Sequence, residues 1–291
     1  SPSEIDIEAI AFYKDAIVKS EVLTGCEARI IGAGDQAIIT VNSQSDRERQ
    51  RFSIGHELGH WFKDRGRIGN LCSHDDMNSR CKGLAPKEKI ANSFASELLM
   101  PNYLVKCIIK DSPLTLDTIG LIKDSFKTSF MASLRKTIST NYHMGFFACY
   151  DQKGKRKYFS KNSDLHYDFS PPQHAPTGSY VFDLLFNNAK EQSAKILDGS
   201  VWCRNDRASN IVVHEHAFHY HNGDYITING FSDSNKINGA VGFNIDSVSL
   251  VDQNSVEYFA QIITNVELGN DLSGAFADGK ADRILHDWDD E

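Results

Sequence analysis

The spacing of apolar residues predicts a mixture of helices and strands in the first part of the chain. Apolar residues three or four positions apart predict helices, whereas strict alternation predicts half-buried strands. Read in chain order, these patterns predict a helix, two strands and two longer helices, over residues 5–20, 28–31, 36–41, 48–63 and 87–100. The second strand is predicted to be an exposed sheet edge, to which an extended peptide can add through main-chain hydrogen bonds.

Two short helical patterns about a turn follow, over residues 116–123 and 129–140. Four basic residues lie on or beside them: Lys123, Lys127, Arg135 and Lys136. These side chains are candidates for contacts with phosphates, although a solvated helix face is the commoner reason for such charges. Docking of a helical partner protein is an equally good interpretation.

From about residue 144 the pattern changes to short strands around one helix. Strands are predicted over residues 144–150, 157–160, 199–203, 211–221 and 225–229, and the helix over 180–196. Asn222-Gly223 marks a hairpin, so this part is predicted to be an α+β module. It also holds a histidine cluster: His214, His216, His219 and His221. A second metal or a pH sensor would use such residues, but a histidine-rich strand near a sheet edge is the plainer interpretation.

Composition places the chain among ordinary globular proteins. Its 291 residues suffice for two domains, and its net charge of −8 argues against a protein built mainly to coat nucleic acid. The acidic first residues lack the apolar core of a secretory signal, and no apolar run approaches the ~18 residues of a membrane span. Six cysteines are scattered without a Cys-x-x-Cys pair, as expected for reduced thiols. We therefore expect a cytoplasmic protein with no membrane partner.

The main chemical signal is the HExxH motif that runs from His56 to His60. On a helix the two histidines lie one turn apart on the same face, where they can hold one metal ion. Glu57, beside the first histidine, can reach a water on that metal, as in zinc peptidases. Two structural histidines on a buried helix would give the same pattern, so the choice depends on a third ligand.

Catalytic zinc takes three protein ligands and keeps an open position for water. Glu88 is the predicted third ligand, because it begins a strongly helical stretch 28 residues after His60. The competing acid, Glu97, lies nine residues further on and is predicted to face solvent. With the three ligands in place, Glu57 would act as the base when water attacks a peptide carbonyl.

The polar stretch 65–87, between the two motifs, is predicted to be a loop. A thiolate from this loop, Cys81 or alternatively Cys72, could occupy the open metal position and silence the site until it is released or oxidised. His74 could play the same part. An exposed loop thiol without such a role is the competing interpretation.

The two motifs together resemble those of the ImmA/IrrE family of bacterial metallopeptidases. The resemblance covers about residues 5–140, and its more specific half is the segment 88–101, which reads Glu-x-x-Ala-Asn-x-Phe-Ala-x-Glu-Leu-Leu-Met-Pro. It implies that Zn²⁺ is bound by His56, His60 and Glu88. It also implies that Glu57 is the catalytic base.

The resemblance further implies an α+β architecture in three parts. These are a zincin-like metallopeptidase domain over residues 1–112, a helix-turn-helix-like segment over 113–143, and a C-terminal α+β sensor module, similar to a GAF domain, over 144–291. Family members act as zinc endopeptidases that cleave a helix-turn-helix transcriptional repressor, which derepresses stress, mobile-element or phage-defence genes. A nucleic-acid or small-molecule activator acting through the C-terminal module is conceivable.

Two other functions stay open at this point. The chain could be a non-enzymatic zinc-containing regulator, against which the intact Glu57 argues, or a toxin of a toxin–antitoxin pair with broader proteolysis. The donor that stabilises the tetrahedral oxyanion is also open. Its candidates are Tyr103, His74, His143 and Tyr142.

Overall fold

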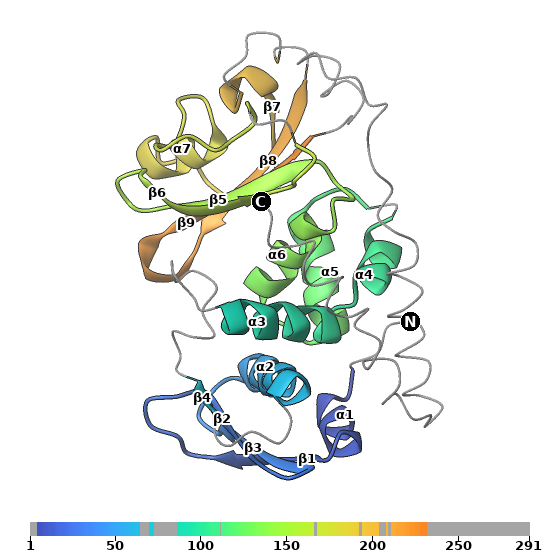
Figure 1. Cartoon of the computed structure of the whole chain (residues 1–291). Helices are drawn as coiled ribbons and strands as arrows, with labels where there is room; N and C mark the ends of the chain where they lie inside the picture. Colours follow the sequence, from blue (N-terminus) through green and yellow to red (C-terminus); the bar gives the residue numbers. More distant parts are fainter. Residues whose placement is uncertain are drawn as a thin grey trace. The chain divides into compact units, whose positions relative to one another are not determined.

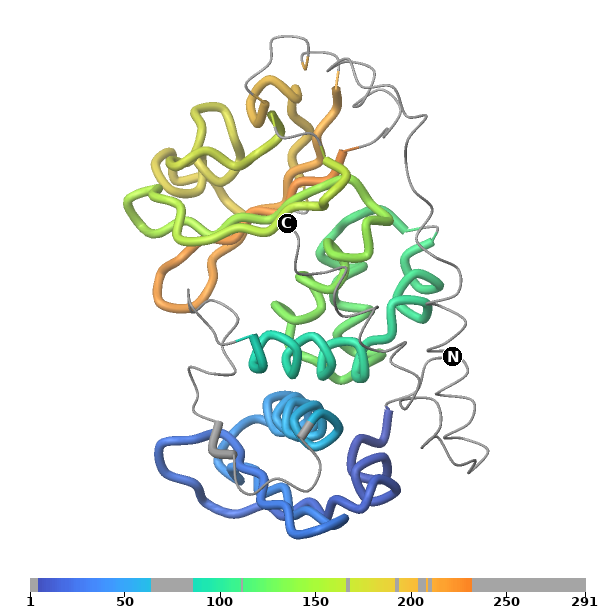
Figure 2. Tube along the Cα trace, viewed as in Figure 1, coloured from blue at the N-terminus to red at the C-terminus, as the bar shows by residue number. Residues whose placement is uncertain are grey.

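The computed structural model describes residues 5–64, 70–72, 86–110, 112–165, 168–191, 194–203, 208 and 211–231. These residues form two compact units (Figures 1 and 2). The N-terminal unit is built mainly from residues 6–45 and 53–95, and the C-terminal unit from residues 46–52 and 96–231. None of the helices in the described ranges is long and apolar enough to cross a membrane.

The N-terminal unit consists of a four-stranded sheet and helices. The elements, in chain order, are α1 (Ile7–Tyr13), β1 (Ala16–Glu21), β2 (Ala28–Ala33), β3 (Gln36–Asn42), α2 (Arg47–Asp64), β4 (Asn70–Cys72) and α3 (Pro86–Leu99). The strand order is β1-β3-β2-β4. Alternate apolar side chains of β2 and β3 are buried, as are Ile54, Leu58 and Trp61 of α2. The Trp61 indole also donates a hydrogen bond to the Lys14 carbonyl oxygen at 2.9 Å, which ties α2 to the turn between α1 and β1.

The prediction of one helix over residues 5–20 is wrong in its second half. The helix ends at Tyr13, and Asp15 takes a left-handed conformation with φ of 61°. The chain then continues as β1, which pairs in parallel with β3 from Ala16 opposite Ala37 onward. Pairing with a strand about twenty residues away thus overrides the local helical spacing.

The prediction that β3 is an exposed edge is also wrong. β3 pairs with β1 on one side and antiparallel with β2 on the other, so it is an inner strand. The described edges of this sheet are β1 and β4. The helices predicted over 48–63 and 87–100 are confirmed as α2 and α3.

The C-terminal unit is a five-stranded antiparallel sheet with helices on both faces (Figure 1). Its elements are α4 (Asn102–Ile109), α5 (Leu116–Phe126), α6 (Phe130–Ser139), β5 (Gly145–Tyr150), β6 (Arg156–Lys161), α7 (Tyr180–Phe186), β7 (Lys195–Asp198), β8 (Val212–His219) and β9 (Tyr225–Phe231). The strand order is β6-β5-β9-β8-β7. The mixed α+β class is therefore confirmed, whereas the likeness to a GAF domain stays a prediction, as does the division at residues 112 and 143.

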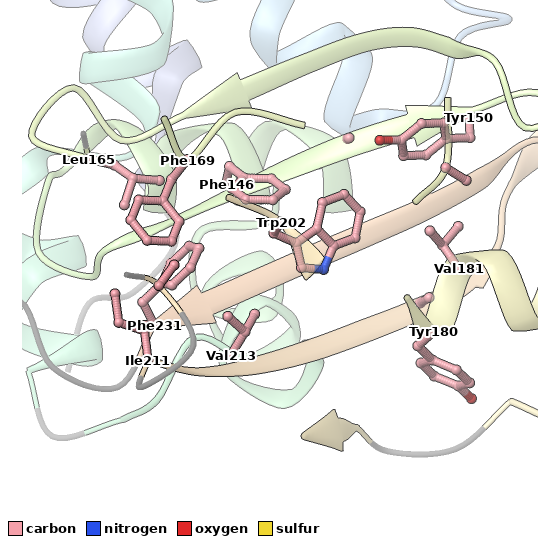
Figure 3. Close-up of a cluster of buried hydrophobic side chains, with 14 of the residues drawn as sticks. Phe146, Tyr150, Leu165, Phe169, Tyr180, Val181, Trp202, Ile211, Val213 and Phe231 are labelled. Atoms are coloured by element: carbon pink, nitrogen blue, oxygen red, sulfur yellow. The ribbon is translucent and has the colours of Figure 1, made fainter. Parts of the chain in front are cut away.

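Each face of this sheet has its own hydrophobic core. On one face, Phe146, Trp202 and Phe231 pack with side chains of α7 (Figure 3). On the other, Phe147 and Ile228 pack with Leu134 of α6 and its neighbours. The helices α5 and α6, predicted over 116–123 and 129–140, therefore share a core with the sheet.

Two elements of this unit differ from the predictions. The helix predicted over 180–196 ends at Phe186, and Asn188 has a φ of 52°, after which residues 195–198 form β7. The strand predicted over 199–203 is a 3-10 turn, Gly199–Val201. The hairpin at Asn222-Gly223 is confirmed, since both residues have a positive φ, 61° and 74°, and β8 and β9 flank them.

Helix α6 is largely buried, which corrects two sequence-based interpretations. Lys136, interpreted from the sequence as a phosphate contact or, more commonly, part of a solvated helix face, is 6% exposed, and its ammonium group binds the Glu97 carboxylate. Burial lowers the pKa of Lys136, and the attraction of Glu97 opposes this shift. Glu97, predicted to face solvent, also accepts a hydrogen bond from the Asn102 N–H at 2.8 Å, at the start of α4. Arg135 lies over the rings of Phe147 and Tyr158.

We predict that Lys136→Met strongly destabilises the protein. Lys136 is buried, whereas Glu97 is 25% exposed, so the loss expected is that of a charged hydrogen bond, about 1.5–3 kcal/mol. The matched control is Lys123→Met, because Lys123 forms an exposed pair with Asp124 and such pairs contribute less than ~1 kcal/mol. Urea unfolding of both variants measures the difference, and equal losses would contradict the assignment.

Candidate metal centre

Two side chains of α2 and one of α3 converge on a single point in the N-terminal unit. The Nε2 atoms of His56 and His60 are 3.0 Å apart. A carboxylate oxygen of Glu88, Oε2, lies 3.1 Å from the His56 Nε2 and 3.3 Å from the His60 Nε2. Both histidines are buried, and Glu88 is 18% exposed. The structure thus brings together all three residues that the sequence predicts as ligands.

The helices can approach this closely because small residues line their contact. A Cβ added at Gly55 would lie 3.2 Å from the Ala95 Cβ, and one added at Gly59 would lie 3.1 Å from the Ala91 Cα. Gly55 and Gly59 are one turn apart on α2, as Ala91 and Ala95 are on α3. The helices therefore run antiparallel with their backbones in near contact, and Glu88 needs only its own side-chain length to reach the histidines.

The geometry and chemistry of the three donors fit a zinc ion. Bonds of ~2.0–2.1 Å in a tetrahedral site separate the ligand atoms by about 3.3 Å, which is close to the observed spacings. Two imidazole nitrogens and one carboxylate form a ligand set of known catalytic zinc sites. Among the described residues, this is the one group of three or more such side chains within metal-binding distance.

Glu57 lies next to His56 on α2, and its side chain is fully buried. A carboxylate buried beside a metal ligand is suited to the transfer of a proton. Its role as the base nevertheless remains a prediction.

Sequence reasoning missed Asn92. Its Oδ1 lies 3.0 Å from the Nδ1 of His56, on the opposite side of the ring from the Nε2 that faces His60 and Glu88. The available signal was its place in the Glu-x-x-Ala-Asn motif, one turn after Glu88 on the same helix face.

Several predicted site residues lie elsewhere or outside the described ranges. Cys81 and His74 are outside them, and Cys72 is placed only by its backbone, on β4 opposite Ala28. The cysteine cap therefore stays a prediction.

Two of the candidates for the oxyanion-stabilising residue bind the end of α4 in the C-terminal unit. The Tyr142 hydroxyl donates to the Lys110 carbonyl at 2.9 Å, and the His143 Nε2 lies 3.1 Å from the Ile109 carbonyl oxygen. Burial lowers the pKa of His143.

The histidine cluster is spread around β8 and the following turn. Of its members, His216 is buried, while His219 is exposed and its Nδ1 pairs with the Glu191 carboxylate at 2.6 Å. Glu215, between two of the histidines, is fully buried on the α7 side. It accepts hydrogen bonds from the backbone N–H groups of Tyr180 and Val181. Among the described residues, the ligand atoms of this cluster do not come close enough together, in a group of three or more, to hold one metal ion.

A His-His-Glu set on two packed helices, with a glutamate directly after the first histidine, is the arrangement used by the HExxH class of metallopeptidases. Comparison with known families agrees. Residues 24–136 match the Peptidase M78 family model, described as the IrrE N-terminal-like domain. The chain therefore contains an IrrE N-terminal-like domain, and the resemblance to the ImmA/IrrE family is confirmed.

Other comparisons add little. Among solved structures, the chain is similar to a Mycobacterium tuberculosis transcriptional regulator, with 13% identity and a TM-score of 0.46, over 83% of this chain and 74% of that chain. That score is too low for an argument about fold. A search of curated proteins finds no significant match.

We predict that the double change Gly55→Ala and Gly59→Ala weakens metal binding. The new methyl groups would push α3 away from α2 by a few tenths of an ångström, because contacts at 3.1–3.2 Å are tighter than nearly all real Cβ contacts. We expect a loss of zinc affinity of about tenfold or more, since ligand orientation sets the affinity. Titration against a chromophoric chelator measures it.

The control for this experiment is Gly120→Ala on α5, where an added Cβ meets nothing within 4 Å. Alanine there should be neutral or slightly stabilising. Unchanged zinc affinity in the double variant would show that the close helix contact does not set the ligand geometry.

Proposed function

We propose that the protein is a zinc-dependent endopeptidase that cleaves a helix-turn-helix transcriptional repressor. The observation that carries the proposal is the convergence of His56, His60 and Glu88 within 3.3 Å of one another, beside the buried Glu57. The IrrE N-terminal-like match over this segment supports the peptidase class. The choice of a repressor as substrate rests on the family resemblance.

The residues of the chain divide the chemistry between them. His56, His60 and Glu88 would hold the zinc, which supplies Lewis acidity and lowers the pKa of a bound water. Glu57 takes the proton from the attacking water as the new C–O bond forms at the peptide carbonyl. It then passes that proton to the amine nitrogen as the C–N bond breaks. The burial of Glu57 keeps solvent from competing for this proton.

The biological setting follows as part of the same proposal. Cleavage of the repressor, in the cytoplasm, would derepress stress, mobile-element or phage-defence genes. The C-terminal unit would gate the reaction in response to a nucleic-acid or small-molecule activator. A non-enzymatic zinc-containing regulator and a toxin of a toxin–antitoxin pair are the alternatives that the experiments below must separate.

Glu57→Gln should abolish cleavage while leaving zinc bound. Glutamine cannot accept the proton, and the loss of a general base lowers the rate by ~10²–10⁴-fold. The test is co-expression with the helix-turn-helix protein encoded nearby, comparing wild type and variant on a gel. A discrete fragment with the wild type alone is the expected result.

Other outcomes of this experiment discriminate among the alternatives. Equal cleavage by Glu57→Gln would reject the mechanism. Degradation of many unrelated proteins by the wild type would favour the toxin. Zinc bound at full occupancy with no cleavage of the repressor, even with added activators, would favour the non-enzymatic regulator.

A cysteine cap on the metal forms the regulatory part of the proposal. If the Cys81 thiolate occupies the fourth zinc position, Cys81→Ser should raise the basal cleavage rate, because serine is a poor zinc ligand. Cys72→Ser is the matched comparison, and Cys107→Ser, which alters an exposed thiol on α4, is the control. Equal basal rates in all three variants and the wild type would reject the cap.

A further inference from the structure

We propose that Asn92 is a positioning residue for the metal centre, which fixes the tautomer and the ring orientation of His56. The inference rests on the proposed zinc site, but not on what the enzyme cleaves. Its basis is the distance of 3.0 Å between the Asn92 Oδ1 and the His56 Nδ1.

The first step concerns the proton on His56. Its side chain is fully buried, so solvent cannot satisfy the ring nitrogen that points away from the ligand cluster. The amide oxygen of Asn92 only accepts hydrogen bonds. The Nδ1 of His56 must therefore carry the proton, which leaves the lone pair on Nε2, the atom that faces His60 and Glu88.

The second step concerns orientation. One hydrogen bond at Nδ1 and one metal bond at Nε2 hold the imidazole at both ends, so the ring cannot turn about its bond to Cβ. Histidines that bind metals generally have such an outer partner, and its loss weakens metal binding by about 10–100-fold.

The third step concerns the helix that supplies Asn92. Glu88 and Asn92 are one turn apart on α3, and His60 and His56 are one turn apart on α2. Because the helices run antiparallel, His60 lies opposite Glu88 and His56 lies opposite Asn92. One helix thus provides both the third ligand and the support for the first ligand.

The amide of Asn92 is neutral, whereas an aspartate at position 92 would carry a negative charge. Asn92 satisfies the His56 N–H without adding a second negative charge beside Glu88. An aspartate would keep the acceptor and add that charge. The pair of substitutions therefore separates the hydrogen bond from the electrostatic effect.

The experiment compares Asn92→Leu, which removes the acceptor at similar volume, with Asn92→Asp, which retains it. Ser93→Ala, at the exposed neighbouring position, is the control. Zinc affinity is measured by competition with a chromophoric chelator, and the melting temperature of each metal-free protein is recorded alongside. We expect a 10–100-fold loss of affinity for Asn92→Leu, recovery to within a few-fold for Asn92→Asp, and no change for the control.

Three results would overturn the inference. These are an unchanged affinity in Asn92→Leu, equal losses in the leucine and aspartate variants, or a wild type that binds no zinc. If Asn92→Leu fails to fold, ¹⁵N NMR of the wild-type histidine rings decides, since a His56 protonated at Nε2 instead of Nδ1 would reject it. Tight, Asn92-dependent zinc binding without repressor cleavage would leave the inference standing and reject the proposed function.

Discussion

The contact between the glycine side of α2 and the alanine side of α3 sets the distances at the metal centre. At Gly59 the position of an absent Cβ lies only 3.1 Å from the Ala91 Cα, so main chain packs almost directly on main chain. With the helix backbones this close, the Glu88 carboxylate oxygen lies within 3.3 Å of both imidazoles. Bulkier residues would hold the helices apart and separate the Glu88 carboxylate from the two imidazoles of α2.

The same contact between α2 and α3 relates the small residues to the polar residues, which both recur at intervals of four along each helix. On α2 each histidine directly follows a glycine, and on α3 Asn92 directly follows Ala91. Residues four apart on a helix share a face, so the small residues form one stripe and the polar residues form a second stripe beside it. The packing that brings the backbones together therefore also aligns the polar side chains. Ligand geometry and helix packing are two results of one arrangement.

Sequence reasoning was successful where the relevant spacing is local. The helices of both motifs, the strands β2 and β3 and the Asn222-Gly223 hairpin all follow from patterns within a few residues. It failed for β1, whose partner is a parallel strand that lies about twenty residues further along the chain, beyond β2. It also missed the hydrogen bond of Asn92, because that bond depends on how two helices are rotated against each other. The spacing from Glu88 places Asn92 on the ligand-bearing face of α3, but it does not tell which side chain of α2 Asn92 meets.

The two acids of α3 show what decides the role of a carboxylate. Glu97 faces the ammonium group of Lys136, which neutralises it and makes it a structural partner of α6 and α4. Glu88 faces the Nε2 atoms of two imidazoles, which are metal-binding atoms. A cation is the partner that satisfies all three donors at once. The two acids are nine residues apart on one helix, and the side chains opposite each of them decide whether it forms an ion pair or is placed to bind a metal.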